Sequence, residues 1–288
     1  MPDICRRAVV DVFPELANAQ FSVAGKGWDS LAVEAEGLIF KFPGGETAAA
    51  ALRREVRLLA VVRPHLHLPV PAMTLHEGPP PFSRHEKLPG ETLDRAGYLL
   101  LSETQRQRLA GDLARFFADL HAISPETMRQ AGAERVEWWD TRPATLQPVW
   151  EALPADVRPA ARNAIVAYRR MPNESADEVY GFFDAHGWNM AFDHQDGRLE
   201  GIFDFADSGL GPREREFVQV SLVHPELAVR AMAAYERISG RRMDRRKVYL
   251  LAAAQRLSEF AGALESGENH DLAKGFAVDW FRQDDIAG

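Results

Sequence analysis

The strand and helix patterns of this chain are unevenly distributed, and this constrains its fold more than any other feature. Apolar runs separated by turn residues fill the first third of the chain. They predict strands near 21–24, 31–35, 38–42, 72–76 and 82–87. One helix, from Thr47 as its N-cap to Val62, is predicted among them. We expect an α+β chain with a small β-rich lobe at residues 1–88 and a larger, mainly α lobe at residues 89–288.

Helical patterns dominate the second lobe. Ser102 and Gln105 form a capping-box pattern, and apolar residues then recur at helical spacing to about His121. Further helices are predicted at 156–171 and over most of 214–282. Residues 179–210 are predicted to form strands and loops. The region of Trp138, Trp139 and Trp150 has a less regular pattern.

Composition and charge exclude several classes of protein. The net charge of −8 argues against nucleic-acid binding, which needs a basic surface, and is compatible with a cationic small-molecule partner. Cys5 is the only cysteine, so neither an internal disulfide nor a cysteine-based zinc site can form. The sequence has no run of eighteen apolar residues and no signal-peptide pattern, so we expect a cytoplasmic protein without membrane segments.

Three polar residues stand at related points of one strand and hairpin pattern. Asp184 precedes the outgoing strand, Asn189 begins it, and Asp204 ends the return strand after a turn at 195–197. A hairpin of this length brings Asn189 and Asp204 together at one end. Each residue alone would fit an ordinary loop rich in turn formers, so the prediction depends on their combination.

This combination fits the requirements of phosphoryl transfer. A nucleoside triphosphate arrives with Mg²⁺, which prefers oxygen ligands such as carboxylate and amide groups. A separate carboxylate can accept the proton of the attacking hydroxyl. In the kinase pattern the base Asp and a metal-binding Asn are five residues apart, with a second Asp downstream, and Asp184, Asn189 and Asp204 have this spacing.

The first lobe contains a matching Lys and Glu. Lys41 lies in a predicted strand, and Glu55 lies on the apolar stripe of the predicted helix, where a carboxylate needs a partner. A strand Lys paired with a helix Glu holds the nucleotide phosphates in kinases, so Lys41 is the natural partner. The alternative is that Glu55 lies at the edge of the stripe and reaches solvent.

Gly25 and Gly27 lie between the first two predicted strands, where a loop covering phosphates would belong. An ordinary hairpin turn explains these glycines equally well. The chain has no Gly-x-x-x-x-Gly-Lys-Ser/Thr pattern, which excludes a P-loop fold.

Two segments carry a resemblance to a known family. Residues 182–189 (Phe-Phe-Asp-Ala-His-Gly-Trp-Asn) resemble the H-G-D-x-H-x-x-N segment of the aminoglycoside phosphotransferase and choline kinase superfamily. Residues 203–212 are similar to the I-D-F-x-D-A-G-x-G-D-P segment of that superfamily. The resemblance runs from residue 20 to about 220 and is nearest to aminoglycoside kinases of the 2″-phosphotransferase type.

The resemblance implies a bilobal protein-kinase-like fold and transfer of a phosphate from ATP or GTP to a hydroxyl of a small molecule. It implies Asp184 as the catalytic base, Asn189 and Asp204 as Mg²⁺ ligands, and Lys41, positioned by Glu55, as a phosphate-binding group. The remaining nucleotide-binding candidates are Gly25, Gly27, Glu86 and Lys87.

The sequence also departs from the family pattern. Phe182 replaces the first His, which supports the catalytic loop in the family, and Pro212 directly follows Gly211 where the family has an Asp. Glu216 is a candidate replacement for a structural Asp further along. His186 is open to two interpretations, a proton relay or a residue that supports the loop.

The acceptor stays open at this point. Residues 255–288 contain seven acidic and three basic side chains, which suits a polyamine sugar such as an aminoglycoside antibiotic or forms a solvated helix face. Choline-, homoserine- or sugar-like acceptors fit the family equally well. Two other functions remain as alternatives: a nucleotide-binding pseudokinase, and a metal-dependent phosphohydrolase that uses Asp184, His186 and Asp204.

Overall fold

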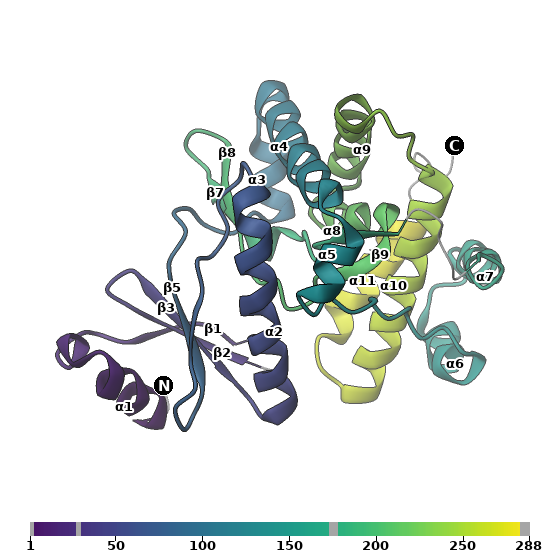
Figure 1. Cartoon of the computed structure of the whole chain (residues 1–288). Helices are drawn as coiled ribbons and strands as arrows, with labels where there is room; N and C mark the ends of the chain where they lie inside the picture. The colour runs from purple at the N-terminus through teal and green to yellow at the C-terminus, as the bar shows by residue number, and fades with distance from the viewer. Residues whose placement is uncertain (1–2, 27–29, 173–177, 283–288) are drawn as a thin grey trace.

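The computed structural model describes residues 3–26, 30–172 and 178–282 of the chain (Figure 1). A β-sheet lies at one end of the molecule, a helical lobe lies at the other, and a long helix runs between them. This arrangement confirms the predicted α+β class and the change from strands to helices along the chain. No helix in the described ranges has the length and apolar character needed to cross a membrane.

The first lobe is built on a five-stranded antiparallel sheet with strand order β1-β2-β3-β5-β4. The strands are β1 (Ser22–Lys26), β2 (Ser30–Ala35), β3 (Leu38–Pro43), β4 (Thr74–His76) and β5 (Phe82–Glu86). The two α-helices of this lobe are α1 (Asp3–Val12) and α2 (Glu46–Val62).

Strand alternation in β3 separates core side chains from functional ones. Phe40 and Phe42 are buried in a cluster with Val9 of α1 and Phe82 of β5. Because neighbouring residues of a strand face opposite sides, Lys41 points to the other face of the sheet, toward α2. The order of apolar and charged residues in this strand therefore places Lys41 in front of Glu55.

The N-cap prediction for α2 is wrong by two residues. Gly45 is the N-cap, its carbonyl accepts the amide of Ala49, and no side chain caps the helix. The helix begins at Glu46, whose carboxylate interacts favourably with the positive end of the helix dipole. Thr47 therefore lies inside the first turn.

The second lobe is mainly helical, as predicted. The capping box of Ser102 and Gln105 is present at the start of α4, which packs against α9 in the core. Its helices are α3 (Arg95–Leu100), α4 (Glu103–Ala122), α5 (Pro125–Gln130), α6 (Pro143–Ala152), α7 (Arg158–Tyr168), α8 (Glu216–Val223), α9 (Pro225–Ser239), α10 (Arg245–Ser266) and α11 (His270–Phe281).

Two pairs of short strands support the segment between α7 and α8. The first pair is β6 (Glu178–Gly181) with β9 (Gly209–Pro212), and the second is β7 (Met190–Asp193) with β8 (Arg198–Ile202). The second pair confirms the predicted hairpin, and Gly197 has the left-handed backbone that its turn requires. One turn of 3-10 helix, η3 (Gly187–Asn189), leads into β7.

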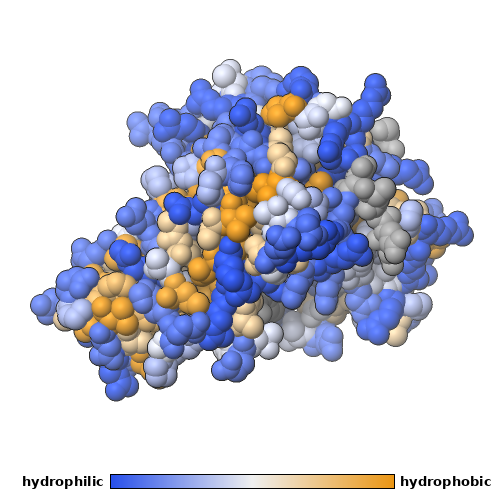
Figure 2. All heavy atoms as spheres, in the orientation of Figure 1, coloured by the Kyte–Doolittle hydropathy of each residue, from blue (hydrophilic) through white to orange (hydrophobic). Residues whose placement is uncertain are grey.

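Hydrophilic side chains cover most of the face shown in Figure 2. Hydrophobic side chains in that view gather over the first lobe and along the seam beside α2. The surface in view is thus that of a folded protein with its apolar residues mostly inside.

Candidate active site

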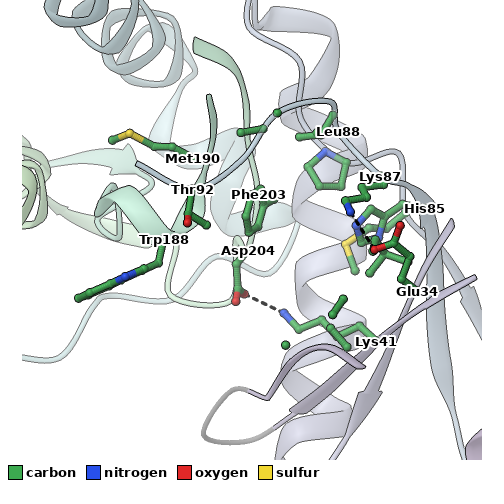
Figure 3. A pocket seen from close by; sticks show the side chains of 18 of the residues that line it. Glu34, Lys41, His85, Lys87, Leu88, Thr92, Trp188, Met190, Phe203 and Asp204 are labelled. Carbon is green, nitrogen blue, oxygen red and sulfur yellow. Dashed lines mark hydrogen bonds and ion pairs between the residues drawn. The ribbon is translucent and has the colours of Figure 1, made fainter. Parts of the chain in front are cut away.

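Lys41 forms one ion pair within the first lobe, with Glu55, and one that crosses to the second lobe, with Asp204. Figure 3 shows the pair with Asp204. Its Nζ lies 2.9 Å from Oε2 of Glu55 and 2.7 Å from Oδ1 of Asp204. The other oxygen of Glu55, Oε1, accepts the backbone amide of Phe205 at 2.8 Å. Glu55, only 2% exposed, therefore holds both Lys41 and the loop that carries Asp204. The predicted strand Lys and helix Glu do form a pair, and Glu55 does not reach solvent.

Two features show how strongly this cluster is fixed. Burial opposes the charge of Lys41, but Glu55 and Asp204 outweigh it and raise the pKa of Lys41 above its ordinary value. Asp204 has a left-handed backbone with φ of 67°, a conformation that few residues other than glycine adopt. Such a conformation persists when surrounding contacts determine it. Here those contacts are the ion pair of Asp204 with Lys41 and the hydrogen bond from the amide of Phe205 to Glu55.

Asp184 is held by three side chains. Asn189 donates from Nδ2 to Oδ2 of Asp184 at 2.7 Å, and Gln219 donates from Nε2 to Oδ1 at 3.0 Å. Nε2 of His186 lies 3.4 Å from the same Oδ1. The predicted proximity of Asp184 and Asn189 is present, whereas no sequence pattern indicated a role for Gln219 of α8.

The backbone before Asp184 is supported by Glu216. Its Oε1 accepts the amide of Phe182 and its Oε2 accepts the amide of Phe183, both at 2.8 Å. Phe183 has a left-handed φ of 61°. A Cβ at Gly181 would lie 2.5 Å from Oε1 of Glu216, so only glycine leaves room for this carboxylate. Nε2 of His121 completes the site at 3.3 Å from Oε1.

Phe182, which replaces the family His, is part of the core. Its ring is fully buried and lies 5.8 Å from the ring of Phe116 and 4.7 Å from that of Phe205. The family His supports the catalytic loop. In this chain, aromatic packing around Phe182 and the hydrogen bonds of Glu216 support that loop.

The hairpin places Asn189 beside Asp204. The amide of Phe203, next to Asp204, donates to the carbonyl of Asn189 at 3.0 Å. Among the described residues, the side-chain hydrogen bonds of Asn189 use Nδ2, so its amide oxygen can serve another ligand. An amide oxygen and a carboxylate are the hard oxygen donors that suit Mg²⁺, so these two residues fit the predicted metal ion.

A cavity of about 430 Å³ lies between the lobes, with Lys41 and Asp204 at one end (Figure 3). Apolar side chains of both lobes line its middle, as suits a flat organic ring. The lining residues include Ala32, Ile39, Met73, His85, Leu88, Met190 and Phe203.

The remaining nucleotide-binding candidates lie at different places. Gly25 and Lys87 line the cavity, and Nζ of Lys87 pairs with Oε2 of Glu34 at 2.8 Å. Glu86 has an exposed side chain outside the lining of this cavity, and Gly27 lies outside the described residues. The side chain of His85 also lines the cavity, and its pKa is lowered to about 4 by burial and by the charge of Lys41. His85 is therefore neutral at physiological pH.

His186 should make stability depend on pH. Burial opposes its charge, but the hydrogen bond to Asp184 and the carboxylate charges outweigh burial and raise its pKa. A raised folded-state pKa stabilises the protein below the unfolded value of about 6.5, and the effect is lost as pH rises through the folded pKa. We therefore expect the Tm of the wild type to fall over this interval.

The measurement is a thermal melt at each pH for the wild type, for His186→Gln and for the control His194→Gln on the hairpin. His186→Gln should remove the fall and the control should keep it. Equal pH profiles for wild type and His186→Gln would contradict the prediction.

Comparisons with known proteins identify the family and the fold of this chain. The model of the phosphotransferase enzyme family matches residues 20–256. No match was found among curated protein sequences. A GDP complex of wild-type aminoglycoside 2′-phosphotransferase-IIIa has a TM-score of 0.78 at 19% identity, with 96% of this chain and 97% of that chain covered.

Two further solved structures are similar over nearly their whole length. Macrolide 2′-phosphotransferase MphH from Brachybacterium faecium has a TM-score of 0.65 at 19% identity, with 99% of each chain covered. A streptomycin–ATP–APH(2″)-IIa ternary complex has a TM-score of 0.65 at 17% identity, with 96% of each covered. These likenesses confirm the predicted bilobal, protein-kinase-like α+β fold. With the family match over residues 20–256, they show that this chain belongs to the phosphotransferase enzyme family.

Proposed function

We propose that this phosphotransferase moves the γ-phosphate of ATP or GTP to a hydroxyl of a small molecule, with Asp184 as the catalytic base. The observation that carries the proposal is the position of two linked clusters beside one cavity. Lys41, Glu55 and Asp204 form one cluster at the end of that cavity. Asp184 and Asn189 form the other, joined to the first by the hairpin.

The reaction follows from the positions of these groups. An oxygen of Asp184 accepts the proton of the acceptor hydroxyl, and the hydroxyl oxygen forms a bond to the γ-phosphorus. The bond between that phosphorus and the β–γ bridging oxygen breaks, and the nucleoside diphosphate leaves. Asn189 and Gln219 orient Asp184 because each donates to one of its two oxygens.

Asn189 and Asp204 would hold Mg²⁺. The ion would neutralise negative charge on the phosphate oxygens when it is bound. Lys41 adds a fixed positive charge at the same end of the cavity, and Glu55 keeps it in position. In this proposal residues 1–88 supply most nucleotide contacts and residues 89–288 supply the acceptor site.

A nucleotide-consumption screen tests the proposal. ATP and GTP would each be offered with Mg²⁺ and panels of aminoglycosides, macrolides, amino alcohols and sugars. Acceptor-dependent release of nucleoside diphosphate is expected. Nucleotide binding without turnover would indicate the pseudokinase, and phosphate release without a nucleotide would indicate the phosphohydrolase. The phosphohydrolase would leave the pair of Lys41 and Glu55 without a role.

The proposal for the acceptor class rests on the similar structures. The similar structures include complexes with kanamycin, streptomycin and gentamicin and also macrolide phosphotransferases. We propose an aminoglycoside or another alcohol of similar size as acceptor, with choline-, homoserine- or sugar-like metabolites as the alternative. A cytoplasmic location and a role in antibiotic resistance belong to the same proposal, and a drug-susceptibility assay tests the second.

Lys41→Met should weaken use of the phosphate donor. The apolar side chain removes the positive charge facing Asp204 and the phosphates, so we expect kcat/KM for the nucleotide to fall by about 10²-fold or more. Steady-state kinetics with varied nucleotide measures this. Lys274→Met is the control, because Lys274 lies on α11 and is not part of the lining of the nucleotide cavity. Equal losses in the two variants would contradict the role of Lys41.

A further inference from the structure

A second cavity lies on the other side of the catalytic loop. It has a volume of about 460 Å³, within the range of small-molecule sites. Residues of α3, η3, α8 and α11 line it, and most of the lining side chains are apolar. We call it the apolar pocket and define it by Leu99, Trp188, Leu222, Leu272 and Phe276.

The exposure of its side chains is unusual for a folded protein. Leu99 is 51% exposed, Trp188 is 47% exposed and Leu272 is 50% exposed. Single exposed apolar residues are common, but here three large ones from separate elements surround one hollow. Apolar surface gathered in a concave site favours the binding of an apolar group.

The pocket is continuous with the proposed catalytic centre. His186 lines the pocket, and its Nε2 is 3.4 Å from Oδ1 of Asp184. Trp188 lines both the nucleotide cavity and the apolar pocket, and its ring lies 5.0 Å from that of His186 and 6.4 Å from that of Phe276. A molecule in the pocket would therefore lie one imidazole ring away from the base.

The wall of the apolar pocket next to the catalytic loop is closely packed. The amide of Leu93 donates to the carbonyl of Gly187 at 3.0 Å, and a Cβ at Gly187 would lie 1.6 Å from the carbonyl oxygen of Leu93. Glycine is needed there because the loop meets the start of the second lobe so closely. The shape of the pocket is thus set by backbone packing as well as by its side chains.

The charged groups at the rim are already paired. Arg95 pairs with Asp279 at 3.2 Å, and Asp94 caps α3 by accepting the amide of Gly97. Polar groups approach Asp184 from other elements. Gln255 of α10 donates to Gln219 at 2.7 Å and to Glu259 at 2.9 Å. The surroundings of Asp184 are therefore polar toward α10 and apolar toward α11.

We propose that the acceptor is an amphipathic alcohol whose apolar part occupies the apolar pocket while its hydroxyl meets Asp184. This rests on the proposed phosphotransferase function. Among the acceptor classes proposed above, a molecule with polar groups on every side would leave the pocket exposed, so we expect acceptors that also carry an apolar ring or chain to bind more tightly. An acceptor with an apolar ring or chain next to a hydroxyl-bearing polar part would fill both regions.

The test uses alkyl glucosides, which have the same sugar hydroxyls and differ only in the apolar chain. Methyl glucoside and octyl glucoside, below the micelle concentration, would be compared by calorimetric binding to the protein with Mg²⁺ and a non-hydrolysable nucleotide. We expect octyl glucoside to bind at least about tenfold more tightly. Leu272→Asn should remove that preference, and Leu100→Asn, on an 87% exposed neighbour of the pocket, should preserve it.

Each outcome decides the proposal. Equal binding of the two glucosides, no binding of either, or a preference that survives in Leu272→Asn would overturn it. Thermal-shift titration with Mg-nucleotide distinguishes this failure from failure of the proposed function. A protein that binds nucleotide but shows no chain-length preference lacks only the amphipathic acceptor, whereas one that does not bind nucleotide lacks the donor side as well.

Discussion

Asp184→Asn is expected to lower kcat by about 10³-fold, because an amide cannot accept the proton of the acceptor hydroxyl. The replacement has nearly the same shape and keeps one oxygen, which can accept from either Asn189 or Gln219 but not from both. Steady-state turnover with the best acceptor of the nucleotide-consumption screen measures the effect.

The loss should be confined to the chemical step. Within the described part of the chain, neither Lys41 nor Asp204 forms a hydrogen bond or ion pair with Asp184, so Mg-nucleotide should still raise the Tm of the variant. Asp196→Asn is the matched control, because Asp196 lies exposed in the turn of the same hairpin. Asp184→Asn with more than about a tenth of wild-type turnover would exclude Asp184 as the base.

The nucleotide side of the site could be predicted from the sequence because local periodicity determines it. In β3, alternation with the buried Phe40 and Phe42 turns Lys41 to the opposite face. In α2, the apolar stripe forces Glu55 into a buried position where it needs a partner. Asp204 joins them because the hairpin returns it to the level of Asn189. Each step involves an ordinary pattern within one element.

The acceptor side could not be predicted, because it depends on contacts between elements. Gln219 lies in a helix that reads as an ordinary core helix, and nothing in its spacing indicates that it reaches Asp184 thirty-five residues away. The apolar pocket is formed by four separate elements. Helix α6 was also missed, since Pro148 within it interrupts the pattern that predicts helices.

The departures from the family pattern were visible in the sequence, but their consequence was not. Phe182 in place of a His put the geometry of the loop in question, and Glu216 was a candidate for a structural role. The structure connects the two, because Glu216 accepts the amides of Phe182 and Phe183. A sequence pattern cannot show which backbone amides a buried carboxylate will accept.

Glu216→Ala should have the largest effect on stability. The carboxylate is fully buried, and its removal leaves the amides of Phe182 and Phe183 without an acceptor. Each unsatisfied buried donor costs about 1–3 kcal/mol, so the free energy of unfolding should fall by about 2–6 kcal/mol. That is a large part of the 5–15 kcal/mol typical of a folded domain. Urea denaturation followed by circular dichroism measures the change.

A graded series distinguishes lost hydrogen bonds from a cavity. Glu216→Gln has nearly the volume of Glu but only one side-chain oxygen, so it can accept one of the two amides and should lie between wild type and Glu216→Ala. Loss of either amide contact also frees Phe183 from its left-handed backbone, which moves Asp184 away from Asn189. Turnover should therefore fall in both variants, at temperatures where both remain folded. A Gln variant as stable and as active as the wild type would show that Glu216 fills space and does not fix the loop.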